Sequence, residues 1–303
     1  MEPKTQDHSL ADFLKVRPRL FGIAYRMLGS ASEAEDIVQD VWLRWQATDR
    51  SVVLDPPAFL AMTATRLAIN FAQSARSRHE TYVGPWLPEP VDTSTDPQLG
   101  AERGQALEFA VLLLLEKLSP TERAAYVLRE AFDYPYRQIA EILQLEEANT
   151  RQLVTRARQH IADGRRTPVS SAEQRRLLEA FIAAAQKGDL ATLEGLFASD
   201  VVSYSDGGGV VRTAARAPIS GSERVAKFIA SFAWHFWTGV ALQFVDTNGQ
   251  ASVLISRDGE SVGFVAVDAS AQGIDQIMWI LRPSKLTAIA KSYQTKTNAV
   301  VGH

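Results

Sequence analysis

Residues 134–161, YPYRQIAEILQLEEANTRQLVTRARQHI, predict two short helices with a turn between them. The first helix covers 136–143 and the second covers 149–161. Apolar side chains recur at helical spacing along one face of the second helix: Leu153, Val154, Ala157 and Ile161. The outward face carries side chains that bond phosphates and base edges: Arg151, Gln152, Thr155, Arg156, Arg158 and Gln159. This pattern favours a helix-turn-helix that enters a major groove, and a helical hairpin with a solvated basic face is the alternative.

The residues before this pair are also helical. Ser30, with Glu33 three positions later, is a capping box that starts an amphipathic helix with one acidic side. A further helix is expected to begin after Asp55. Residues 81–104 are rich in proline and glycine, which predicts a linker. Helices resume at 105, and Ser119 is followed by Pro and Glu in the order of a strong helix start.

The pattern changes after a polar joint near 164–171. Helices are expected at about 172–187, 189–198 and 222–235, with a short strand at 201–205. Three alternating segments and a fourth strand follow, at 240–247, 250–257, 260–268 and 274–282. Asn248-Gly249 and Asp258-Gly259 favour tight hairpin turns. We therefore expect an α+β domain with helices on one side of a curved antiparallel sheet.

Composition limits the classes of protein that this chain can form. Its 303 residues allow two or three domains, and 46% apolar residues suffice for packed cores. The absence of cysteine excludes thiolate catalysis and disulfides, and five scattered histidines show no metal-ligand spacing. No metal or cofactor is expected. No apolar run reaches the roughly 20 residues of a membrane span, so we expect a cytoplasmic protein without a membrane partner.

The net charge of −3 argues against a protein that binds DNA strongly on its own. Residues 151–166 nevertheless hold five arginines against one aspartate, which is a single small basic patch. Such a patch supplies only weak nonspecific affinity for phosphates.

The chain resembles a known family at this point. Residues 13–79, with FGIAYRMLGSASEAEDIVQDVWLRW, resemble region 2 of the extracytoplasmic-function sigma factors, and 105–161 resemble their region 4. The linker YVGPWLPEP, the DGGG at 206–209 and the late RPSKL resemble the subgroup with a C-terminal SnoaL-like extension. The resemblance implies two all-α domains, a region 2 bundle at 8–80 and a region 4 helix-turn-helix at 105–166. A cone-shaped α+β SnoaL-like domain at 171–303 would follow.

The resemblance also implies partners and roles. Core RNA polymerase would be bound through its β′ clamp helices and its β flap, and promoter DNA at two elements. Residues expected to contact the clamp are Glu33, Glu35, Asp36, Asp40, Trp42 and Arg44. The alternative for Trp42 and Trp45 is a place in the helical core, which we expect for at least one of them.

Promoter contacts are implied in both helical regions. The segment 48–57 would capture a flipped base of the minus-ten element, with contacts from Arg66, Asn70, Arg76 and Arg78. Relatives usually carry an acidic residue where Asn70 stands, which implies weaker melting or a shifted preference. The minus-thirty-five element would be recognised by Arg151, Gln152, Thr155 and Arg156, with Arg158 and Gln159 on the backbone.

The subgroup implies an intramolecular regulatory contact in the last domain. Its expected residues are Trp86, Leu87, Pro88, Glu89 and Pro90 of the linker, Asp206, Gly207, Gly208 and Gly209, and Arg282, Pro283, Lys285 and Leu286. Relatives tend to have Asn and Asp where Arg282 and Ser284 stand.

Other functions remain open from the residues themselves. Tyr204, Asp206, His235 and Asp246 could form an acid/base site, but their spacing shows no catalytic pair. A small ligand in the last domain is a second possibility, and a ligand-responsive DNA-binding regulator without polymerase is a third. We predict a sigma factor that catalyses nothing and is regulated by its fused domain.

Overall fold

The computed structural model describes residues 3–79, 82–94 and 107–301, and the side chains of 10–74, 82–94 and 107–294. Contacts divide the chain into two compact units. Unit 1 is Met1–Glu80, Asp96–Leu107 and Val111–Gly164, and unit 2 is Thr81–Thr95, Glu108–Ala110 and Arg165–His303. The two helical regions therefore cluster together, and residues 82–94, which we call the linker segment, fold with the C-terminal part. The rest of the predicted linker, residue 81 and residues 95–104, lies outside the described residues.

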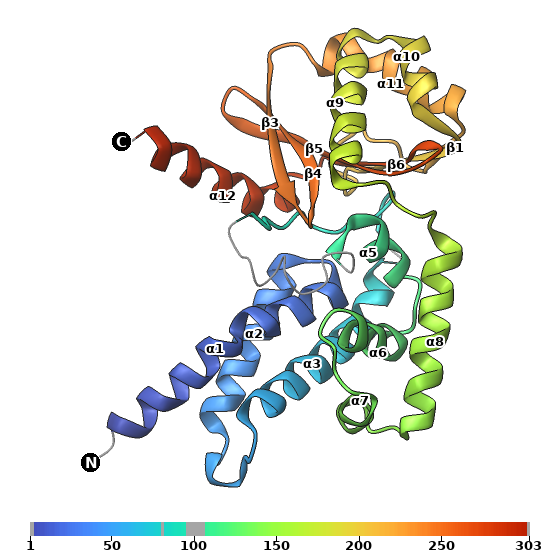
Figure 1. Ribbon diagram of the computed structural model, residues 1–303. Coiled ribbons are helices and arrows are strands. Elements are labelled where there is room, and N and C mark those ends of the chain that lie inside the picture. The colour runs from blue at the N-terminus through green and yellow to red at the C-terminus, as the bar shows by residue number, and fades with distance from the viewer. Residues whose placement is uncertain (1–2, 80–81, 95–106, 302–303) are drawn as a thin grey trace. The chain divides into compact units, whose positions relative to one another are not determined.

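Unit 1 is all helical (Figure 1). Its elements are α1 (Pro3–Leu28), α2 (Ala31–Ala47), the 3₁₀ helix η1 (Arg50–Val52), α3 (Pro56–His79), the C-terminal part of α5 (Phe109–Leu115), α6 (Pro120–Glu130), α7 (Tyr136–Leu143) and α8 (Glu147–Gly164). The caps expected from the sequence are present. Ser30 accepts from the Glu33 amide, and Ser119 and Glu122 form a complete capping box. The Asp55 carboxylate accepts from the Ala58 amide at 3.0 Å and caps α3.

Arginines hold the helices of unit 1 together. Arg123 of α6 is 5% exposed, and its guanidinium donates to the carbonyl oxygen of Met27 and to Glu116, both at 2.5 Å. Arg19 of α1 donates to the carbonyl oxygen of Phe132 at 2.9 Å. These bonds link α1 to α6 and to the loop that follows it, and the one to Met27 is buried, so Arg123 satisfies an acceptor that would otherwise lack a partner.

Unit 2 is α+β, as the sequence predicted. Its elements are α9 (Ser171–Lys187), α10 (Leu190–Leu196), β1 (Phe197–Asp206), β2 (Ile219–Ser220), α11 (Ser222–Phe236), β3 (Val240–Thr247), β4 (Gln250–Arg257), β5 (Glu260–Ser270), β6 (Gly273–Ile280) and α12 (Pro283–Val301). The strands form one sheet in the order β2-β1-β6-β5-β4-β3. Helices α9 and α11 pack against this sheet (Figure 1). Their apolar faces enclose a core with Phe181, Ile229 and Trp279.

The sheet differs from the expected antiparallel one because β1 and β6 run parallel. Strand β2 and helix α11 lie in the chain between β1 and β3, so β1 is not part of the meander formed by β3 to β6. The hairpins at Asn248-Gly249 and Asp258-Gly259 form as predicted, with positive φ at all four residues. The two faces of β5 are both covered: Val265 lies in the core with α9, and Phe264 on the other face packs its ring 5.6 Å from that of Phe109.

The helix α12 has no counterpart in the sequence prediction, which ended its elements at RPSKL. Leu286 and Ile289 of α12 are each 1% exposed, so this helix packs into unit 2 through one apolar stripe. No helix in the described part of the chain is long and apolar enough to cross a lipid bilayer.

Candidate functional sites

The predicted recognition helix is α8. Gln144, with φ of 57°, ends α7 in the left-handed region and turns the chain into α8. The apolar residues Leu153, Val154 and Ala157 are buried, together with Thr150. All six side chains selected for base and phosphate contacts are exposed. The periodicity of apolar residues is sufficient to predict this exposure, because a helix that packs on one side presents its other side to solvent.

Several of these exposed side chains already have partners within unit 1. Arg156 pairs with Glu122 at 3.2 Å and Arg158 with Glu130 at 2.7 Å, both on α6. Arg151 pairs with Glu147 and lies over the Tyr136 ring, with 4.4 Å from its guanidinium carbon to the centroid. Gln159 donates to Asp163 at 2.7 Å, and Thr155 donates to the Arg151 carbonyl at 2.9 Å. Exposed ion pairs of this kind stabilise weakly, so phosphates can replace the carboxylates.

The acidic face of α2 points away from its buried face. Glu35, Asp36, Asp40 and Arg44 are exposed, and Glu33 is half-buried near the cap. Trp45 is 1% exposed, as expected for at least one of the two tryptophans. Trp42 is half-buried, and its ring lies 4.9 Å from that of Phe13. Glu35 pairs with Arg17 at 2.6 Å, which leaves Asp36 and Asp40 as the exposed acidic centre of this face.

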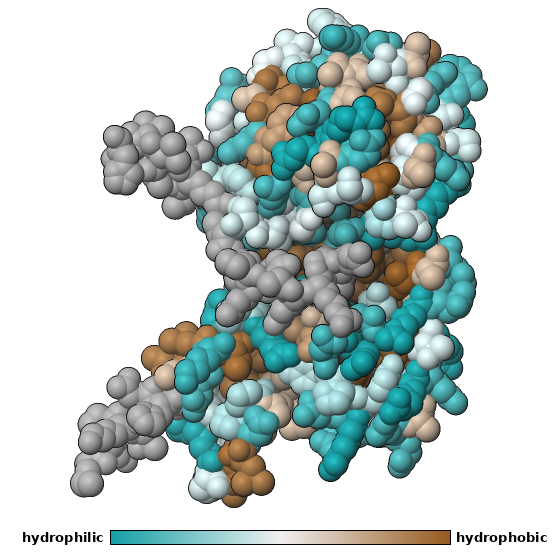
Figure 2. All heavy atoms as spheres, in the orientation of Figure 1, coloured by the Kyte–Doolittle hydropathy of each residue, from teal (hydrophilic) through white to brown (hydrophobic). Residues whose placement is uncertain are grey.

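The segment between α2 and α3 exposes large apolar side chains. Val52 is 73% exposed and Leu54 is fully exposed. Figure 2 shows hydrophobic surface where α2 and α3 are joined. Asp49 accepts from the Ser51 amide at 3.0 Å and shapes η1. An apolar tip on a rigid turn, with no core to cover it, is suited to contact an unstacked base.

The side chains selected on α3 do not form one group. Asn70 is exposed. Arg66 instead donates to the carbonyl oxygens of Ile142 at 2.9 Å and Glu141 at 3.3 Å, at the C-terminus of α7. A cation is favoured there because the last carbonyls of a helix carry partial negative charge. The side chains of Arg76 and Arg78 lie outside the described residues.

In unit 2, one carboxylate joins two distant segments to the turn that follows it. Asp206 at the end of β1 is fully buried. It accepts from the Tyr82 hydroxyl at 2.6 Å, the Leu87 amide at 2.9 Å and the Gly208 amide at 3.1 Å. The ammonium of Lys285 lies 2.7 Å from the same carboxylate. The carboxylate thus has donors from the linker segment, from the glycine turn and from α12.

Lys285 also binds the linker segment directly. Its ammonium donates to the Leu87 carbonyl oxygen and lies 4.5 Å from the centroid of the Trp86 ring. Burial lowers the pKa of Lys285, opposed by the attraction of Asp206. Burial and the bond to Asp206 raise the pKa of the Tyr82 hydroxyl. Arg282 donates to that hydroxyl at 3.1 Å, so this arginine also contacts the linker segment.

The glycines after Asp206 allow the backbone to approach closely. Gly208 has φ of 57°, and a Cβ there would lie 2.6 Å from Cδ of Arg282. A Cβ on Gly207 would lie 2.5 Å from the Ala214 side chain. Gly209 has φ of 75° and faces Val83 of the linker segment. Pro283 begins α12, and Pro88 and Pro90 are buried while Glu89 is half-buried.

The linker segment has further contacts that the sequence did not indicate. The Val91 amide donates to the Asn248 side-chain oxygen at 2.9 Å, and Asp92 bridges to Thr247. Ser292 of α12 donates to Asp92. Asn248 was selected only for its hairpin turn. Nothing local marks it as an acceptor, because its partner lies 157 residues away.

The four residues considered for acid/base chemistry are not assembled into a site. Asp206 is engaged by Lys285 and Tyr82. Asp246 pairs with Arg175 at 2.7 Å, and His235 is exposed. Tyr204 is half-buried, and burial raises its pKa. Among the residues whose structure is described, no group of His, Asp and Glu could hold a metal ion.

Comparison with known proteins agrees with this layout. Residues 13–78 match the family model of sigma-70 region 2, and 108–161 match that of sigma-70 region 4. The two regions in this order define a sigma-70-type subunit of RNA polymerase.

Relatives over most of the chain define the family more closely. The chain is 37% identical over 252 residues to the ECF RNA polymerase sigma factor SigJ of Mycobacterium tuberculosis, covering 80% of this chain and 79% of the relative. It is 31% identical over 275 residues to the probable ECF RNA polymerase sigma factor SigI of the same species, covering 89% and 92%. The crystal structure of SigJ matches with a TM-score of 0.73 at 31% identity, covering 92% of this chain and 98% of that one.

The chain therefore belongs to the extracytoplasmic-function (ECF) family of RNA polymerase sigma factors, with a SnoaL-like C-terminal unit. Its function is promoter-specific transcription initiation together with core RNA polymerase, and it is not an enzyme.

Proposed function

We propose that this sigma factor binds the β′ clamp helices through α2 and is regulated through the linker segment. The exposed acidic pair Asp36 and Asp40 supports the first part, since it can face a basic partner while Trp45 anchors the helix in the core. Region 4 binds the β flap and recognises the minus-thirty-five element through α8. The apolar tip at Val52 and Leu54, with Asn70, Arg76 and Arg78 on α3, contacts the minus-ten element. This work takes place in the cytoplasm, where polymerase meets its promoters.

The polymerase contact is tested with core enzyme and a charge reversal. We expect Asp40→Arg to weaken binding to core polymerase at least tenfold, because it places a cation at the centre of the acidic face. Glu179→Arg in α9 of unit 2 is the matched control, with the same charge change at an exposed position. If the two variants bind core polymerase with equal affinity, α2 is not part of the interface with core polymerase.

Regulation rests on one observation: the buried Asp206–Lys285 pair holds the linker segment at Tyr82, Trp86 and Leu87. This segment lies in the chain between region 2 and region 4. A linker that is free can extend to the full reach of its residues, whereas one bound along part of its length cannot. Binding of the linker segment by unit 2 therefore restricts how far the two regions can separate on a promoter. A small ligand of unit 2 is a further candidate partner in this regulation.

The regulatory proposal predicts that release of the linker segment raises transcription. Tyr82→Phe and Trp86→Ala weaken the contact without leaving a buried charge unpaired. Arg224→Ala, at an exposed position of α11, is the control. Run-off transcription with reconstituted holoenzyme should rise for the first two variants and not for the control. If hydrogen exchange shows a released segment while output stays at the wild-type level, the contact is structural only.

A further inference from the structure

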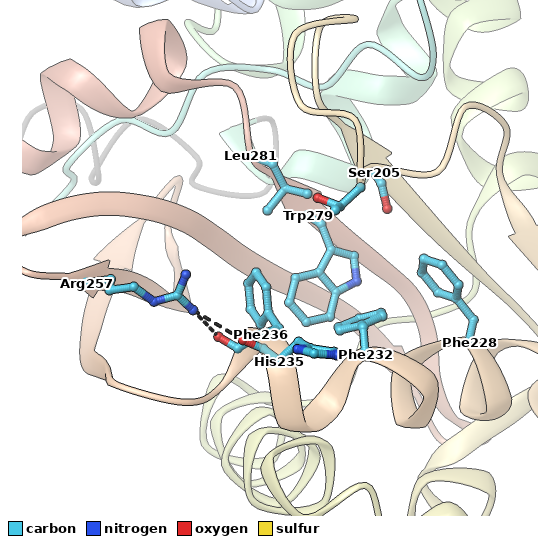
Figure 3. A pocket seen from close by; sticks show the side chains of 9 residues that line it. Ser205, Phe228, Phe232, His235, Phe236, Arg257, Trp279 and Leu281 are labelled. Carbon is cyan, nitrogen blue, oxygen red and sulfur yellow. Dashed lines mark hydrogen bonds between the residues drawn. The ribbon is translucent and has the colours of Figure 1, made fainter.

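A cavity of about 230 Å³ opens in unit 2 between α11 and the sheet (Figure 3). Its wall is mostly aromatic. Phe228, Phe232 and Phe236 recur every four residues on α11 and so share one face of that helix. The rings of Phe228 and Phe232 are 5.1 Å apart, and Phe232 lies 6.1 Å from the Trp279 ring of β6, both edge to face. The three phenylalanines are only half-buried, although each belongs to this apolar cluster.

The floor of the cavity carries polar groups on a rigid element. Ser205 of β1 and Trp279 of β6 are register partners in the parallel pair, so their side chains lie on the same face of the sheet. Figure 3 shows the Ser205 hydroxyl and the Trp279 ring nitrogen beside the space that Phe228 borders. Both side chains are buried, with Trp279 2% and Ser205 3% exposed.

The indole N–H of Trp279 is the informative group. Its nitrogen is buried and has no hydrogen-bond acceptor among the described residues. Leaving a buried donor unpaired costs about 1–3 kcal/mol, which is why such donors nearly always have a partner. An acceptor atom of a ligand in this cavity would satisfy it. The donor sits on a strand of the core and cannot turn away to solvent.

The remaining lining favours an uncharged ligand. Among the described residues, none with a carboxylate lines the cavity, whereas the imidazole of His235 does. Arg257 also borders it, but its guanidinium donates to the Phe236 carbonyl at 2.7 Å and the His235 carbonyl at 3.5 Å. An anion would have to lose its hydration against phenylalanine rings, while the guanidinium of Arg257 is directed at these backbone carbonyls, which is unfavourable.

We propose that unit 2 binds an uncharged aromatic molecule of one or two rings that carries a carbonyl oxygen, with this oxygen accepting the Trp279 N–H. The aromatic rings of α11 stack against the ligand edge to face. The volume is below the roughly 300–1,000 Å³ of sites for drug-sized molecules, which sets the limit on ring number. This inference does not depend on the regulatory role of the linker segment.

Three probes of one ring system test the proposal on the full chain: 2-acetonaphthone, 2-ethylnaphthalene and 2-naphthoate. Binding is measured by calorimetry and by quenching of tryptophan fluorescence. We expect saturable binding of the ketone at one site per chain. The hydrocarbon should bind about 2–10-fold more weakly, which corresponds to the loss of one neutral hydrogen bond. The carboxylate should bind most weakly of the three.

A variant separates the hydrogen bond from the fit of the ring. Trp279→Phe keeps an aromatic ring without the N–H, so the ketone and the hydrocarbon should bind it equally. Trp234→Phe is the matched control, because Trp234 is 71% exposed and does not line the cavity. It should keep the wild-type order of affinities. If Trp279→Phe does not fold by circular dichroism, the wild-type order of the three probes decides alone. Absence of saturable ketone binding, equal binding of ketone and hydrocarbon, or tightest binding of the carboxylate would overturn the proposal.

Discussion

The ammonium of Lys285 lies 2.7 Å from the carboxylate of Asp206, and the two side chains are 6% and 0% exposed. A buried ion pair needs further hydrogen bonds to offset the loss of hydration. Here the Leu87 amide and the Tyr82 hydroxyl supply them to Asp206, and the Leu87 carbonyl oxygen supplies one to Lys285. The pair and the linker segment therefore stabilise each other.

Removal of the Asp206 charge should destabilise unit 2 strongly. We expect Asp206→Asn to lower the free energy of unfolding by about 3–5 kcal/mol, because the Lys285 ammonium is left buried without a counter-charge. Urea unfolding followed by tryptophan fluorescence measures this. Asp246→Asn breaks the exposed pair with Arg175 and should lower it by less than about 1 kcal/mol. Lys285→Met added to Asp206→Asn should restore part of the loss. A single variant as stable as the wild type would contradict the coupling.

Two glycine-to-alanine variants should separate the cost of steric crowding from the cost of backbone strain. Gly208→Ala and Gly259→Ala both place a side chain at positive φ, 57° and 82°, which costs about 1–2 kcal/mol. Only Gly208 has a close neighbour, Cδ of Arg282 at 2.6 Å, whereas nothing lies within 4 Å of a Cβ on Gly259. Thermal unfolding should show a larger loss for Gly208→Ala. In a double-mutant cycle, Arg282→Ala should remove the excess. Equal losses at both glycines would mean that the turn tolerates a side chain.

Tyr82 should resist ionisation while the chain is folded. Its raised pKa means that the folded state keeps the proton when the unfolded state loses it, so the stabilisation is complete below about pH 10 and declines as the pH rises further. At about pH 10.5, folded wild type and Tyr82→Phe should give the same tyrosinate absorbance. In denaturant at that pH they should differ by about three quarters of one tyrosinate, because an unfolded tyrosine with a pKa of about 10 is mostly ionised there. A difference of that size already in the folded proteins would show that Asp206 does not hold this hydroxyl.

Substitutions on α8 should divide into two kinds. Gln152→Ala should change the preference at one or two base pairs, by about 1–3 kcal/mol at a bidentate contact. Arg158→Ala should weaken binding of holoenzyme to all promoters alike and reduce the salt dependence by about one phosphate contact. Arg137→Ala on α7, with an 84% exposed side chain paired to Glu141, is the control and should change neither. If Gln152→Ala weakens binding to all promoters equally, Gln152 contacts the DNA backbone and not a base.

Local signals predicted much of this protein. Ser119 caps α6 because its hydroxyl, a proline and Glu122 stand at adjacent positions of one turn. Asn248-Gly249 closes a hairpin because both residues accept positive φ. The exposed face of α8 follows from the spacing of Leu153, Val154 and Ala157. Each of these signals acts between residues a few positions apart, so the amino-acid sequence is sufficient to predict these features.

Other features depend on partners far away in the chain. The partners of Arg66 are carbonyls about 75 residues away, and nothing beside it distinguishes a helix-capping arginine from one that binds DNA. The parallel pairing of Ser205 with Trp279 decides that both face one cavity, and the alternation of each strand is the same for parallel and antiparallel neighbours.

The amino-acid sequence by itself determined most of the helices, though not α12, together with their caps, the hairpins and the two helical regions that mark a sigma factor, because these depend on local propensity and periodicity. Only the tertiary structure decided that the linker segment folds with unit 2, that Asp206 meets Lys285 and Tyr82, and that Trp279 has a buried donor without a partner. Those features depend on which surfaces pack together when apolar area is buried. The local sequence around each residue does not show which distant surface it will contact.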